Sequence, residues 1–134
     1  MQLTIKIIFI ISVISGLLFF NSASVDQIPQ EFISIFKTGN SKKLSAYLNQ
    51  NVELAIFENI NVYSKSQAQQ ILGKFFNDNP PESFVILSDG LKKDSRSIIG
   101  TLKTKNATFR VYILLKKADD QKEYIQQLKI EKKQ

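Results

Sequence analysis

The sequence contains no cysteine and no histidine among its 134 residues. Without cysteine there are no disulfides, zinc–thiolate sites, iron–sulfur clusters or cysteine nucleophiles. Without histidine the commonest metal ligand and the usual proton shuttle near neutral pH are missing. The five glycines are scattered singly, so there is no glycine-rich phosphate loop. We therefore expect neither a metal nor a cofactor.

The composition is that of one globular domain. The chain is 43% hydrophobic and 22% charged, which excludes a disordered or repetitive protein. Its length suits a single domain. Because no disulfide is available, the fold must be held together by packing.

Residues 1–24 are predicted to be a signal peptide. Lys6 is the only charge before Asp26, and an apolar run covers 7–20. Such a run is shorter than the roughly 20 residues of a membrane span but suits a signal sequence. Small residues at 22–24 place cleavage after Ala23 or after Ser24; an uncleaved anchor is the alternative. We expect a periplasmic or secreted protein, consisting of residues 25–134, with no membrane span after cleavage.

Two helices are predicted first in the exported part. A stripe of apolar residues at helical spacing favours a helix that starts near Pro29 and stops at Gly39. Its members are Ile28, Phe32, Ile33, Ile35 and Phe36. Ser41 is predicted to cap a second, short helix.

Alternation then predicts strands over 52–57 and 60–63, with a turn at Glu58–Asn59. Ser64, with Gln67 three residues later, predicts a capping box at the start of a helix. Pro80 and Pro81 end that helix.

The sequence after Pro81 predicts a β-sheet. Strands are predicted over 83–89, 96–104, 108–116 and 123–131, with a turn at Asp89–Gly90. The last three of these runs are joined by short connections, which favours an antiparallel meander. Tyr124, Leu128 and Ile130 are expected on one side of the last strand.

The resulting order is helix, helix, strand, strand, helix and four strands, which predicts an α+β fold. This order resembles the nuclear transport factor 2-like fold, a cone in which a curved antiparallel sheet of about six strands wraps around about three helices. From Ile28 to Lys132 the layout is also similar to an uncharacterised family of small exported bacterial proteins of that class. The resemblance implies fold more than function, because the fold hosts enzymes, binding modules and assembly domains alike.

The candidate ligand-binding residues are Tyr63, Glu58 and Asp89. Some relatives of the fold are isomerases or dehydratases that use a carboxylate and tyrosine hydroxyls inside the cone. Alternation places Glu53 and Tyr112 off the packed face, and the turns expected at Glu58 and Asp89 favour solvated acids. No catalytic residue is assigned.

Positive charge is concentrated in the second half of the chain. Residues 85–134 carry twelve basic and six acidic side chains, whereas residues 25–84 carry five and six. The lysines flank turns and are interrupted by acids, which is typical of a solvated sheet edge. We expect no nucleic-acid partner, because no aromatic residues interleave with the basic sites.

A partner surface is predicted on the face of 108–116 opposite the core. Arg110, Tyr112 and Leu114 share that face, together with part of Val85, Leu87 and Ile99. Apolar groups on a second sheet face are usually covered, so we expect a homodimer or partner contact here.

Three hypotheses follow. The first is a non-enzymatic module that binds an unknown small ligand or protein partner. The second is a cofactor-free isomerase or dehydratase with a buried carboxylate. The third is an assembly or structural protein of the cell envelope. The first two need an open cone, which Phe32, Phe36, Phe75 and Phe76 either line or fill.

Overall fold

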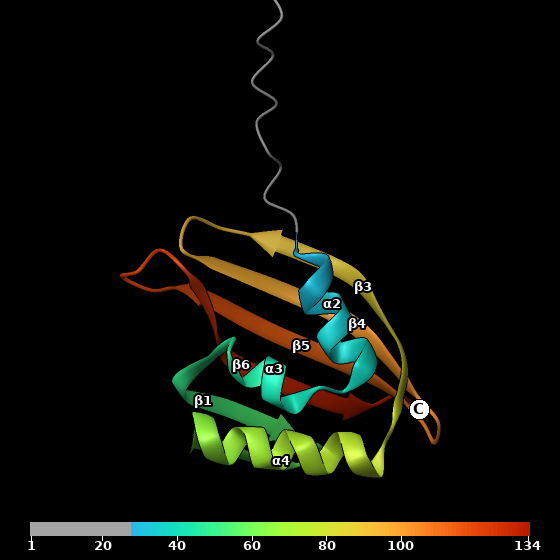
Figure 1. The fold of residues 1–134 in the computed structure, drawn as a ribbon. Helices are drawn as coiled ribbons and strands as arrows, with labels where there is room; N and C mark the ends of the chain where they lie inside the picture. Colours follow the sequence, from blue (N-terminus) through green and yellow to red (C-terminus); the bar gives the residue numbers. More distant parts are fainter. Residues whose placement is uncertain (1–27) are drawn as a thin grey trace, which may run out of the picture.

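The computed structural model describes residues 28–134, in which three helices lie on one face of a curved sheet (Figure 1). The elements are α2 (Gln30–Thr38), α3 (Ser41–Ser45), β1 (Leu48–Ile56), β2 (Asn59–Ser64), α4 (Lys65–Asp78), β3 (Pro81–Leu91), β4 (Ser95–Thr104), β5 (Thr108–Lys117) and β6 (Glu123–Lys132). The predicted α+β class and element order are confirmed. The predicted signal peptide, 1–24, lies outside the described residues.

The six strands form one sheet in the order β2-β1-β6-β5-β4-β3. As predicted, β4 to β6 form an antiparallel meander. The β3 strand extends it by pairing antiparallel with β4, and β1 and β2 form an antiparallel hairpin. The sheet is not antiparallel throughout, because β1 and β6 run parallel, with Leu54 opposite Leu128. The chain crosses by α4 to the far edge of the sheet, so the returning meander meets β1 in the parallel direction.

The helix boundaries follow local capping chemistry. Gly39 ends α2 in the left-handed conformation, at φ 65°, as its position predicted. The Ser64 side chain accepts a hydrogen bond from the backbone N–H of Gln67, and the side-chain oxygen of Gln67 accepts one from the backbone N–H of Ser64, so the capping box is confirmed. For α3 the prediction was one residue late. Asn40, not Ser41, is the cap, and its side chain accepts from the N–H of Lys43.

Two features of the meander differ from expectation. Asp89 and Gly90 are not a turn but belong to β3, opposite Ile98 and Ser97, and the chain reverses at 92–94 instead. In β6 a register shift skips Gln126. Because one extra residue moves the following side chains to the other face, Ile125 is buried with Leu128 and Ile130, in place of Tyr124.

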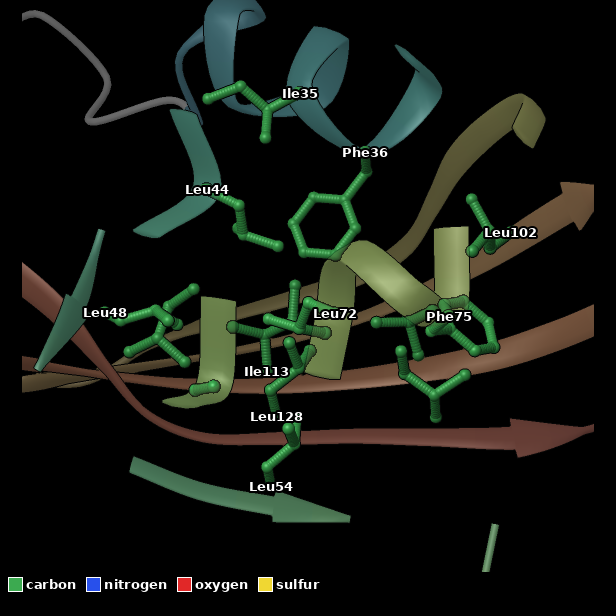
Figure 2. Packing of buried hydrophobic residues seen from close by; sticks show 14 of the residues in the cluster. Ile35, Phe36, Leu44, Leu48, Leu54, Leu72, Phe75, Leu102, Ile113 and Leu128 are labelled. Atoms are coloured by element: carbon green, nitrogen blue, oxygen red, sulfur yellow. The ribbon is translucent and has the colours of Figure 1, made fainter. Parts of the chain in front are cut away.

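Phenylalanine rings fill the space between helices and sheet. Phe32, Phe36, Phe75 and Phe76 are each no more than 5% exposed. Phe36 of α2 points towards the sheet, among side chains that include Leu72 and Ile113 (Figure 2), and stacks on Phe84 with ring centroids 4.7 Å apart. These four residues therefore fill the centre of the cone.

Candidate functional site

A cleft of about 570 Å³ lies between the β1–β2 hairpin and α4; we call it the hairpin cleft. Its hairpin wall comes from the inward-facing residues of β1 and β2, since Leu54 pairs with Asn61 and Ile56 with Asn59. Its helix wall comes from Ile71 and Phe75 of α4. This volume falls within the range of roughly 300–1,000 Å³ usual for small-molecule sites.

Two of the three candidate residues line this cleft. Glu58 is exposed at the hairpin turn, and Tyr63 is half-buried on β2. They come together because the hairpin folds β2 back along β1, beside the α4 helix that Ser64 begins. The third candidate, Asp89, lies elsewhere, on β3 at the opposite edge of the sheet.

The turn of the hairpin is formed by Phe57 and Glu58, one residue earlier than predicted. Phe57 has a φ of 57°, a left-handed conformation that destabilises an L-residue by about 1–2 kcal/mol. Its side chain is 47% exposed, and its ring centroid lies 6.3 Å from that of Phe75 and 6.0 Å from that of Phe109. An aromatic ring is thus held at the mouth of the cleft by a strained backbone.

Polar groups surround the mouth. Asn59, Asn61 and Asn79 supply side-chain amides. Lys74 and Asp78 form an ion pair of 2.6 Å along α4. The cleft therefore has an apolar, aromatic floor and a hydrogen-bonding rim, which suits a ligand with both apolar and polar faces.

Asp89 forms an ion pair with Arg96. The Nε atom of Arg96 lies 3.4 Å from Oδ1 of Asp89, and its Nη1 lies 3.8 Å from Oε2 of Glu123. Arg96 is only 2% exposed, so this member of the basic set in 85–134 does not lie on a solvated edge. It alternates inward with Ile98 and Leu102 on β4, and that parity was visible in the sequence.

A second pocket of about 450 Å³ lies near the start of α2. Arg96 and Glu123 line it together with Tyr47 and Tyr124. Burial, and to a lesser extent the negative charge of Glu31, raises the pKa of Tyr47. Gln121, with φ 67°, also lines this pocket. Because acids flank the arginine, we interpret this pocket as the end of an internal ion-pair network.

The outer face of the sheet carries a row of apolar residues across strands. Ile99 pairs with Tyr112, and Ala55 pairs with Ile60 at the far edge. Lys129 lies between Tyr112 and Ala55. Leu114 lies on the same outer face next to this row, as its alternation with the buried Ile113 and Leu115 predicted. Arg110 lies on this face as well and is exposed.

Residues 29–131 match the family model described as "Domain of unknown function (DUF4783)". The chain belongs to the DUF4783 family. A DUF4783 protein from Bacteroides uniformis is 32% identical, with a TM-score of 0.76, over 81% of this chain and 99% of that one. Another, from Bacteroides ovatus, is 34% identical, with a TM-score of 0.76, over 80% of this chain and 96% of that one.

Beyond DUF4783, the similarity concerns the fold alone. An NTF-2 like protein of unknown function from Silicibacter pomeroyi is 8% identical, with a TM-score of 0.59, over 78% of this chain and 88% of that one. The predicted resemblance to the nuclear transport factor 2-like fold is thereby confirmed. No match was found among the curated proteins.

Two further properties concern residues 28–134 of this DUF4783 protein. Within this range no three acidic side chains gather as metal ligands would. None of its described helices has the length and apolar character to cross a membrane.

Sequence reasoning missed most of the cleft. Phe57 was assigned to a strand, and the α4 residues Lys74 and Asp78 carried no signal because their position opposite the hairpin is a tertiary property. The asparagines of β2 alternate with Ile60 and Val62, and this pattern was the one available hint that β2 presents a polar row to the helix side.

Proposed function

We propose that the protein is a binding module whose small-molecule ligand occupies the hairpin cleft. The observation that carries this proposal is the cleft itself, a roughly 570 Å³ space with an aromatic floor and a polar rim, at the margin of a core whose centre is filled by phenylalanine rings. Glu58 and Tyr63, the two candidates that it brings together, are the residues expected to contact the ligand.

The positions of the acidic side chains favour a binding function over a catalytic one. An isomerase or dehydratase of the kind considered above needs a carboxyl enclosed by apolar groups. Among residues 28–134 the buried polar or charged side chains are Arg96 and Thr104, neither of them an acid. Glu58 is exposed on the rim, a position that suits hydrogen bonding to a ligand.

The test is a screen of small polar and aromatic fragments against the isotopically labelled mature protein, followed by amide chemical shifts. We expect the shift changes of bound fragments to concentrate at 57–63 and 71–79. Ile71→Trp should fill the cleft and abolish them. Ile33→Trp is the matched control, because Ile33 is also half-buried but lies on α2. Shift changes that are scattered, or that persist in I71W, would contradict the proposal.

A second copy of the chain is the proposed occupant of the outer sheet face. Val85, Ile60 and Val62 are 55%, 63% and 61% exposed at its two edges. Charges of both signs lie among the apolar groups, since Arg110 pairs with Glu131 in register and Glu131 bonds Lys129 at 2.6 Å. A face that carries both signs is complementary to its own copy in a two-fold dimer.

Sedimentation tests the dimer directly. Leu114→Glu places a charge in the apolar region and should shift a dimer to monomer at high micromolar concentration. Lys116→Glu, at the exposed end of the same strand, serves as the control and should leave the dimer intact. A wild-type protein that is monomeric throughout would refute this interface and leave the cleft proposal unaffected.

Export is proposed from the sequence of residues 1–24 alone. The apolar run behind Lys6 and the small residues at 22–24 support cleavage after Ala23 or Ser24. Mass spectrometry of the protein from the producing cells tests this. A mature chain that begins at Ser24 or Val25 is expected, and an intact Met1 in a membrane fraction would favour an uncleaved anchor instead.

A further inference from the structure

Phe57 occupies a backbone position that its residue type disfavours. Two-residue hairpin turns that need a positive φ are normally built with glycine, asparagine or aspartate. Phe57 adopts a φ of 57° and leaves 47% of its side chain exposed. Neither the turn geometry nor complete burial accounts for an aromatic ring here. Strain of this kind is typical of sites where a side chain must be held in one place.

Packing fixes the orientation of this ring. Its centroid lies 6.3 Å from Phe75, tilted by 59°, and 6.0 Å from Phe109, tilted by 49°. The Phe57 N–H donates to the carbonyl of Ile130, at 3.0 Å. The ring is therefore anchored by two buried aromatics and one backbone bond, while its exposed part lines the hairpin cleft.

The charge of the rim disfavours anionic ligands. Its ionisable side chains are Glu58, Lys74 and Asp78. Lys74 is bound to Asp78, so the pair neutralises itself and Glu58 adds one negative charge. A phosphate or carboxylate would meet net repulsion here.

The uncharged rim groups favour a ligand rich in hydroxyls. An amide side chain has two N–H donors and an oxygen that accepts twice, and a carboxylate only accepts. Asn79 donates to the Phe75 carbonyl and Asn61 accepts from the Val62 N–H, which leaves each amide with a second donor or acceptor for a ligand. Hydroxyl groups both donate and accept, so they satisfy all of these groups. The electron-rich face of a phenyl ring attracts the weakly positive C–H groups of a saturated ring.

We propose that the hairpin cleft binds a neutral saccharide, with one sugar ring stacked on Phe57 and its hydroxyls bonded to the rim amides and to Glu58. This inference rests on the proposed function and specifies its ligand class. Tyr63, half-buried on the hairpin wall, supplies a further hydroxyl within the cleft.

The experiment titrates the labelled mature protein with cellobiose, maltose and N-acetylglucosamine as neutral probes, and with glucuronate as an anionic probe with a similar ring. We expect shift changes at 57–63 with at least one neutral probe. Glucuronate should bind at least about tenfold more weakly than that probe.

Variants at Phe57 test the stacking. Phe57→Leu keeps an apolar group but removes the aromatic face, and should weaken binding by about tenfold or more. Phe57→Trp keeps an aromatic face and should retain binding within about threefold. The amide spectrum of each variant away from 57–63 reports whether the fold is retained. A sugar affinity that is unchanged in F57L would overturn the role of Phe57.

The possible outcomes distinguish a failure of the saccharide inference from a failure of the proposed binding function. If fragments bind in the cleft and no neutral sugar does, the saccharide inference is wrong and the binding module stands. If neither fragments nor sugars change the shifts of the cleft, both are wrong. If glucuronate binds as well as the neutral probes, the argument from rim charge fails and the ligand class with it.

Discussion

The ring of Phe84 lies directly over Gly100 on the neighbouring strand. A Cβ atom at Gly100 would stand 2.5 Å from Cε2 of Phe84, a separation at which two non-bonded carbon atoms clash unless one of them moves. The same ring stacks on Phe36 of α2, with centroids 4.7 Å apart. The missing side chain at Gly100 thus lets β3 place an aromatic ring under the helix and fill the cone.

Gly100→Ala is therefore expected to destabilise the protein by overpacking, by about 1–3 kcal/mol. Its matched control is Gly90→Ala, because a Cβ there would meet nothing closer than a carbonyl oxygen at 3.8 Å. Urea unfolding of both variants is the measurement, with the midpoint of G100A lowered and that of G90A unchanged or raised. Equal midpoints would show that Phe84 moves aside freely.

The contrast between two ion pairs supplies a second prediction. Arg96 is buried and joins β3 to β6 through Asp89 and Glu123, whereas Lys74 and Asp78 pair on the surface of α4. Arg96→Met leaves the carboxylates of Asp89 and Glu123 without their cationic partner and should lower the free energy of unfolding by about 2–3 kcal/mol. The loss is smaller than for a fully enclosed ion pair because both carboxylates reach solvent. Lys74→Met should change it by no more than about 0.5 kcal/mol.

A triple variant tests whether the unpaired carboxylates cause the stability loss expected in R96M. Adding Asp89→Asn and Glu123→Gln to R96M removes the stranded charges and should recover part of the lost stability, measured by the same urea midpoints. If the triple variant is less stable than R96M alone, the loss comes from the packing of the arginine stem and not from the uncompensated acids.

The parts of the fold that were predictable from the sequence depend on near neighbours. Ser64 and Gln67 are three residues apart, and the inward alternation of Phe109, Val111 and Ile113 needs only one strand. What failed depends on partners far away in the chain. The parallel contact of β1 with β6 is set by the route of the whole chain, and the bulge at Gln126 by its pairing with β5.

The candidate site divides in the same way. Glu58 and Tyr63 were found because they flank a predicted turn and strand. The opposite wall of the cleft, with Lys74 and Phe75, arises only when α4 folds back on the hairpin. Asp89 was misplaced because Asp-Gly is a strong turn signal, whereas here Gly90 extends in β3 and the acid pairs with Arg96.

The capping box of α4 gives a third prediction, and it concerns the helix wall of the cleft. Ser64→Ala removes the acceptor for the N–H of Gln67 and should destabilise the protein by about 1 kcal/mol. Hydrogen exchange should show the loss in the first turn of α4, with the last turn near Asn79 unchanged. Ser66→Ala is the control, because it removes the exposed hydroxyl that lies 3.3 Å from that of Ser64 and leaves the Ser64 hydroxyl in place to accept from the N–H of Gln67. Equal effects of the two variants would contradict the capping role.

The β5–β6 turn contains a carboxyl whose titration is perturbed in a defined direction. The hydroxyl of Tyr124 donates to Oδ2 of Asp120 at 2.7 Å, and the N–H of Lys122 donates to Oδ1 at 2.9 Å. These two bonds lower the pKa of Asp120 from its ordinary 3.8, and the bond from Tyr124 has the larger effect. In turn, the hydrogen bond to the Asp120 carboxylate raises the pKa of Tyr124 above 10.0.

The sign of the pH dependence follows from these directions. Because folding lowers the pKa of Asp120, its contribution to stability is present above pH 3.8 and is lost as the pH falls through the lowered value. Tyr124→Phe should raise the pKa of Asp120 towards 3.8, measured by the carboxyl carbon chemical shift against pH. Tyr63→Phe, on the far edge strand, should leave that titration unchanged. A Y124F protein that titrates like the wild type would mean that the Lys122 N–H alone holds the carboxylate.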